Sequence, residues 1–95
     1  MSYEYRVITD KKTSAVDLDL IYNNLRNSSL FQAAILTKHG IFVPGAGRYE
    51  LVGLEIEDEG FFVSTNMNKN EIEVLLGIIR DTMFERGVKI TIEEA

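Results

Sequence analysis

The sequence predicts an α+β fold, a two-layer sandwich in which two main helices lie on one face of an antiparallel or mixed sheet. Several segments alternate polar and apolar residues as strands do, and two longer segments repeat apolar residues at helical spacing. They follow one another as strand, helix, several strands, helix and strand. This order approximates a ferredoxin-like arrangement with an extra strand or short helix between the first helix and the central hairpin. With 95 residues, the chain is expected to form a single domain spanning residues 1–95.

The beginning of the chain predicts one strand followed by one helix. Residues Tyr3 to Thr9 alternate in polarity and are expected to form a half-buried strand. Ser14 stands three residues before Asp17, which is the spacing of a capping box. We therefore expect a helix from Ala15 to about Arg26 or Asn27, with an apolar stripe of Leu18, Ile21, Tyr22 and Leu25.

The segment from Leu30 to Lys38 permits two interpretations. Ser29 and Gln32 have capping-box spacing, which favours a short second helix. The alternative takes alternate residues from Phe31 onward as one face of a strand, with a two-residue turn at His39 and Gly40 in which the glycine would tolerate a positive φ. The strand is the preferred interpretation, and Pro44 is expected to end the strand that follows the turn.

The second half of the chain predicts a hairpin, a helix and a last strand. Residues 49–58 and 61–65 alternate in polarity on either side of a turn at Glu59 and Gly60. Asn68 and Glu71 have the capping-box spacing of a helix start, and Gly87 is suited to end that helix. A strand from Val88 to Ile92 then closes the chain, and the apolar stripe of the helix consists of Ile72, Leu75, Leu76, Ile79 and Met83.

The composition excludes several classes of function. Cysteine is absent, so disulfides, thiolate catalysis and cysteine-ligated metals are excluded. The net charge of -5 disfavours binding to nucleic acid or to an anionic membrane, and it favours a basic protein partner. Without a signal-like or membrane-spanning run, a cytoplasmic location is expected. No motif indicates a cofactor, a metal site or a known family.

The loop after Pro44 is the most site-like segment. Gly45 and Gly47 could present main-chain amides to an anion, and Arg48 could bind a phosphate or carboxylate. His39 is the only histidine and the first candidate for acid–base chemistry near neutral pH. The loop lacks the ending of a phosphate-binding motif, however, and His39 has no evident catalytic partner. A plain connecting loop and an exposed turn residue explain both more simply.

Two further sets of residues indicate contacts with other proteins. The acidic hairpin end, formed by Glu55, Glu57, Asp58 and Glu59, would attract a basic partner, although a solvated turn is the simpler explanation. Each helix also has apolar residues away from its main stripe, which favour an oligomer interface; the alternatives are scattered exposure or cover by the segment from Leu30 to Gly47. These candidate interface residues are Val16 and Leu20 on the first helix and Val74 and Ile78 on the last.

Two hypotheses about function follow. The first is a non-catalytic, acidic protein-interaction or regulatory module that forms a homo-oligomer and offers its acidic hairpin to a basic partner. The second is a small-molecule binding domain or minimal enzyme that takes an anionic ligand at the Gly45 to Arg48 loop, with His39 as an acid–base group. Surplus apolar residues on the helices and the absence of a catalytic set favour the first.

Overall fold

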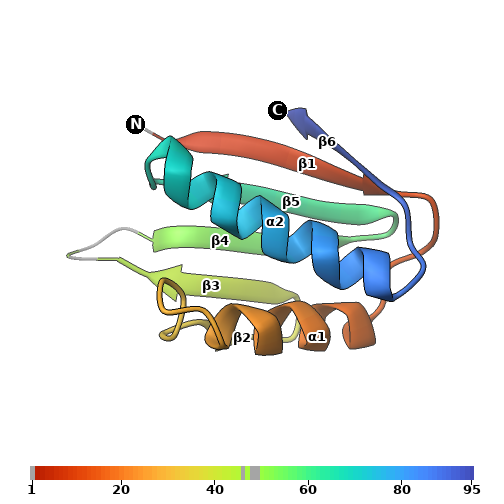
Figure 1. Cartoon of the computed structure of the whole chain (residues 1–95), viewed down its shortest axis with the longest axis horizontal. Coiled ribbons are helices and arrows are strands. Elements are labelled where there is room, and N and C mark those ends of the chain that lie inside the picture. The colour runs from red at the N-terminus through yellow and green to blue at the C-terminus, as the bar shows by residue number, and fades with distance from the viewer. Residues whose placement is uncertain (1, 46, 48–49) are drawn as a thin grey trace.

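The computed structural model describes residues 2–45, 47 and 50–95. Within these residues the chain forms six strands and two helices, and both helices lie on the same face of the sheet (Figure 1). This confirms the α+β class and the two-layer arrangement. The elements are β1 (Tyr3–Thr9), α1 (Ala15–Arg26), β2 (Ile35–Leu36), β3 (Gly40–Pro44), β4 (Glu50–Glu57), β5 (Gly60–Thr65), α2 (Lys69–Glu85) and β6 (Ile90–Glu94).

The six strands form one sheet in the order β2-β3-β4-β5-β1-β6, and every neighbouring pair is antiparallel. Strand β1 lies between β5 and β6, which are joined by α2. Since β5 and β6 are both antiparallel to β1, they run parallel to each other. The extra segment between α1 and the central hairpin is the β2–β3 hairpin, which extends the sheet at one edge.

The ends of both helices lie where the local sequence predicts them. The backbone N–H of Ser14 donates to Asp17 Oδ2 over 2.9 Å at the start of α1. At the start of α2, Asn68 Oδ1 accepts from the backbone N–H of Glu71 over 2.9 Å. Gly87 follows α2 with a φ of 73°, a conformation that ends helices and that glycine adopts readily.

The hydrophobic core lies between the helices and one face of the sheet. Alternate strand residues such as Val7, Leu54 and Phe61 are almost fully buried, and the stripes of both helices pack against them. Each such side chain contributes about 1.5–3 kcal/mol when it leaves water. The alternation expected for β1, β4 and β5 is therefore confirmed as a division between a buried and an uncovered face.

The prediction for Leu30 to Lys38 was largely wrong. Only Ile35–Leu36 forms a strand, and the residues before it form consecutive turns, closed by hydrogen bonds such as Ala34 N–H to the Phe31 carbonyl at 3.0 Å. The physical reason is burial: Phe31 and Ala34 are 0% and 4% exposed, and the turns bring both into the core. An extended strand would not place residues three apart on the same face.

The turn between β2 and β3 also differs from the expectation. The Thr37 N–H donates to the Gly40 carbonyl over 2.8 Å, so the two loop residues are Lys38 and His39. Gly40 is the first residue of β3 and does not have a positive φ. Glycine is required there for space, because a Cβ at Gly40 would lie 2.1 Å from the Leu54 carbonyl oxygen. Strand β6 likewise begins at Ile90, two residues later than predicted.

Candidate functional site on the open face of the sheet

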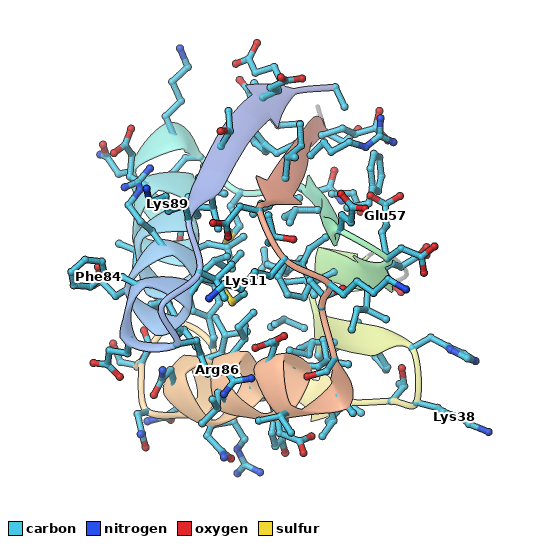
Figure 2. The ribbon with its side chains drawn as sticks, turned by 90° about the vertical axis from the view of Figure 1, so that its right-hand side faces the viewer. Lys11, Lys38, Glu57, Phe84, Arg86 and Lys89 are labelled. Atoms are coloured by element: carbon cyan, nitrogen blue, oxygen red, sulfur yellow. The ribbon has the colours of Figure 1, made fainter. Side chains whose placement is uncertain are left out.

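The helices leave one side of the sheet uncovered, and we call this side the open face (Figure 2). Its side chains come from the strand positions that alternate with the core positions. In the middle of the sheet, Phe42, Gly53 and Ser64 lie in register across β3, β4 and β5. The flanking positions carry mainly acidic side chains, namely Glu4, Glu55, Glu57 and Glu93, together with Arg6.

A hollow of about 190 Å³ lies at Gly53, and we call it the Gly53 hollow. Its lining residues include Phe42, His39, Glu50 and Glu55. Glycine makes the room, since a Cβ at Gly53 would lie 2.9 Å from Glu50 Oε2 and 3.0 Å from the Ser64 hydroxyl oxygen. An aromatic ring beside carboxylates attracts a cation such as a lysine or arginine side chain.

In the neighbouring part of the open face, the cationic side chain of Arg6 already lies between an aromatic ring and a carboxylate. The guanidinium of Arg6 lies 5.7 Å from the centre of the Phe62 ring, within the range of a cation–π contact. Its Nε is also 3.5 Å from Glu57 Oε1. Both side chains are about half exposed, so this ion pair is screened by water and contributes little stability. The arrangement shows that the face can place a guanidinium between an aromatic ring and a carboxylate.

The structure brings some of the predicted site residues together. His39 lies in the exposed β2–β3 turn and lines the Gly53 hollow beside Glu50 and Glu55, two carboxylates that would repel an anion. Gly47 has a φ of 81°, as a turn glycine often does. Arg48 lies outside the described residues, and the expected anion site at Gly45, Gly47 and Arg48 stays a prediction.

The acidic hairpin end is divided between two surroundings. Glu55 and Glu57 belong to β4 and lie on the open face, whereas Asp58 and Glu59 form the turn into β5. The carbonyls of the turn are engaged, because the Thr9 and Thr13 N–H groups donate to Glu59 and Asp58 respectively, each over 3.0 Å. These hydrogen bonds hold the turn against the end of β1 and the segment before α1, while the carboxylates of Asp58 and Glu59 remain exposed.

The candidate interface residues on the helices differ in exposure. Val16, Leu20 and Val74 are 52%, 37% and 41% exposed, as expected. Ile78 is partly buried and packs against the core, so the expectation of an exposed Ile78 was wrong. The sequence interpretation also missed Phe84, which is 79% exposed and points away from the molecule (Figure 2).

Two polar contacts between the helices were not predicted. Arg86, which follows α2, places its Nε 2.8 Å from Asp17 Oδ1, and Asp17 is 2% exposed. The Asn24 amide donates to the Thr82 hydroxyl over 2.8 Å. Asp17 was predicted only as a capping residue, and its partner is 69 positions away in the sequence. No local pattern reveals such a pair.

A second hollow, of about 260 Å³, lies between α2, the first half of β1 and the C-terminal end of β6. Its lining includes Tyr5, Glu73, Leu76 and Glu94. Burial, followed by the charges of Glu94, Tyr3 and Glu73, raises the pKa of Tyr5 above its ordinary value of 10.0. The hydroxyl is therefore neutral throughout the physiological pH range.

Comparisons with known proteins do not add an identity to this geometry. No protein-family model matches the chain, and no curated protein or solved structure resembles it significantly. The ferredoxin-like order is thus not confirmed by any matching fold. In the described part of the chain, no helix has the length and apolar character to cross a membrane. The same residues contain no cluster of three potential metal ligands.

Proposed function

We propose that the chain is a non-catalytic protein-interaction module that binds a basic segment of a partner protein on its open face and also associates with itself. The observation that carries the docking proposal is the Gly53 hollow, where Phe42 lies beside Glu50 and Glu55. A lysine or arginine side chain entering this hollow would gain both a cation–π contact and charge-assisted hydrogen bonds.

The Arg6 contacts support this choice of ligand chemistry. On the same face, Arg6 already lies over Phe62 and near Glu57. A partner's arginine in the Gly53 hollow would repeat that arrangement at β3 and β4, whereas Arg6 lies on β1. The net charge of -5 would in addition draw a basic partner toward the protein and speed its association.

The alternative of an anionic ligand is less well supported. His39, its proposed acid–base group, lies among carboxylates that would repel a phosphate or carboxylate ligand. The Gly45 to Arg48 loop remains the only other basis for that hypothesis. We therefore prefer the interaction module, and its cytoplasmic location stays a prediction from composition.

We also infer that the fold is an enlarged ferredoxin-like sandwich. The strands β4, β5, β1 and β6 are neighbours in that order, with α1 and α2 as the two connecting helices. Two interleaved strand–helix–strand units produce such an order. The β2–β3 hairpin is then the addition at one edge. This interpretation concerns architecture only, because one fold hosts many functions.

The docking proposal is tested by titrating the ¹⁵N-labelled protein with an octa-arginine peptide. In the NMR spectrum, we expect the largest chemical-shift changes at the backbone amides around Phe42, Gly53 and Ser64. The variant Glu55→Lys should weaken binding several-fold more than Glu85→Lys, which makes the same charge change on an exposed position of α2. Equal weakening by both variants, or shift changes confined to the helices, would contradict docking on the open face.

A further inference from the structure

The two edges of the sheet differ in how well they are protected against pairing with another chain. At one edge, β2 has only two residues, and its neighbour β3 ends with Pro44 and a shift in register. Short strands, proline and irregular register all discourage further pairing. At the other edge, β6 has five residues and pairs with β1 in one continuous register. Among the described residues, no strand pairs with the outer side of β6.

The outer side of β6 presents main-chain groups from alternate residues. The Asp10 N–H donates to the Lys89 carbonyl over 3.1 Å, and the Ala95 N–H donates to the Glu4 carbonyl over 2.9 Å. Antiparallel pairing alternates, so Thr91, like Lys89, directs its main-chain groups toward β1. The N–H and C=O groups of Ile90 and Ile92 therefore point outward from the sheet.

We propose that a second copy of this chain pairs antiparallel with β6, about a two-fold axis at Thr91, and that the two sheets become continuous. This inference rests on the self-association in the proposed function and names its surface. In this register Ile90 stands opposite Ile92 of the second copy, and both pairs of outward main-chain groups are satisfied. Roughly four main-chain hydrogen bonds would join the two strands.

Charge selects this register over its neighbours. With the axis at Thr91, Lys89 comes opposite Glu93 of the second copy, and symmetry provides this pair twice. An axis at Ile92 would instead place Thr91 opposite Glu93, and an axis at Glu93 would place two glutamates together. Opposite charges across strands stabilise pairing, and like charges destabilise it. Lys89 immediately precedes β6, at this edge of the sheet (Figure 2).

The apolar side chains near this edge are incompletely covered within one copy. Ile90 and Ile92 are only partly buried, although both pack against the core from its outer end. Leu76 of α2 is likewise partly buried and lies on the side of the helix nearest β6. In the proposed dimer, Ile90 of each copy covers Ile92 of the other, so the core continues across the interface.

The first test uses exchanged charges. Lys89→Glu and Glu93→Lys each place two like-charge pairs in the homodimer, and each should raise its dissociation constant at least about fivefold. An equimolar mixture of the two variants should dimerise like the wild type, because both pairs are again opposite in the heterodimer. Sedimentation velocity measures each state, and recovery in the mixture shows that both variants are folded.

The second test uses the absence of cysteine. Thr91→Cys should form a disulfide-linked dimer with oxidised glutathione as the two-electron oxidant, because the two-fold axis brings the two Cβ atoms close together. Glu93→Cys is the matched control, since its sulfur would lie roughly 13 Å from its own counterpart, four residues out of register. At least about tenfold faster cross-linking of Thr91→Cys would support the proposal.

The outcomes separate this inference from the proposed function. A wild-type chain that stays monomeric at high micromolar concentration would overturn both the β6 dimer and the proposed self-association. A wild-type dimer that is unaffected by the charge variants, with equal cross-linking of both cysteine variants, would overturn only the β6 dimer. Weakening of that dimer by Val16→Glu would then assign the interface to the helices instead.

Discussion

Removing the side chain of Arg86 should destabilise the protein, although Arg86 lies just beyond the end of α2. Its Nε is the partner of Asp17 Oδ1 at 2.8 Å, and it links the end of α2 to the first turn of α1 (Figure 2). The other Asp17 oxygen accepts from the Ser14 N–H over 2.9 Å. In Arg86→Ala, one oxygen of a nearly buried carboxylate would lose its protein partner.

The magnitude follows from the different exposure of the two side chains. An unsatisfied buried polar group costs about 1–3 kcal/mol, and more when it is charged. The Asp17 side chain is 3% exposed, but the Arg86 side chain is 40% exposed, so water can enter when Arg86 is truncated. We therefore expect Arg86→Ala to lower the free energy of unfolding by about 2 kcal/mol. For a domain of this size, this corresponds to a melting temperature lower by roughly 8–15 °C.

A double-mutant cycle with Asp17→Asn measures the interaction itself. Urea unfolding followed by circular dichroism should give a coupling energy of about 1–2 kcal/mol between the two positions. Arg80→Ala is the control, because Arg80 is exposed on α2 and forms no ion pair within the described residues. A coupling energy near zero, or equal effects of the two arginine substitutions, would refute the assigned role of Arg86.

Three further predictions concern the framework. Gly40→Ala should destabilise the protein by about 1–3 kcal/mol, because the new Cβ would meet the backbone of β4. Gly77→Ala, in the middle of α2, adds a Cβ that meets no atom within 4 Å and should stabilise the protein by about 0.5–1 kcal/mol. Thermal denaturation of both variants checks this prediction, and a lower stability of Gly77→Ala would contradict it. Asn68→Ala should cost about 1 kcal/mol through the lost cap, measured by urea unfolding, and no change would mean that the cap is dispensable. Because the pKa of Tyr5 is raised in the folded protein, this tyrosine ionises first in the unfolded chain, and the contribution of Tyr5 to stability is fully present below pH 10.0 and is lost as pH rises above that value. Tyrosinate absorbance at 295 nm should show a late titration step that Tyr5→Phe removes. Persistence of this step in the variant would assign it to another tyrosine.

The open face could be predicted only in part. The alternating polarity of residues 49–58 agrees with the position of Glu55 and Glu57 on one face of β4, and the exposure of His39 followed from its position in a turn. The meeting of Glu55 and His39 at the Gly53 hollow depends on the β3–β4 register, which pairs Gly40 with Glu55 and Phe42 with Gly53. The sequence interpretation misplaced the preceding turn by one residue, and it did not identify Gly53 or Phe42 as site residues.

The helices and most strands could be predicted from local sequence, because they depend on interactions between residues two to four positions apart. The capping pairs at Ser14 and Asn68, the stop at Gly87 and the alternation of β1 and β5 are all of this kind. The burial of Phe31 in the core and the pairing of Asp17 with Arg86 could be seen only in the folded chain. Only the sheet order decided that β6 lies at an edge. These features depend on contacts between distant segments, whose energies exceed local preferences but leave no periodic pattern in the sequence.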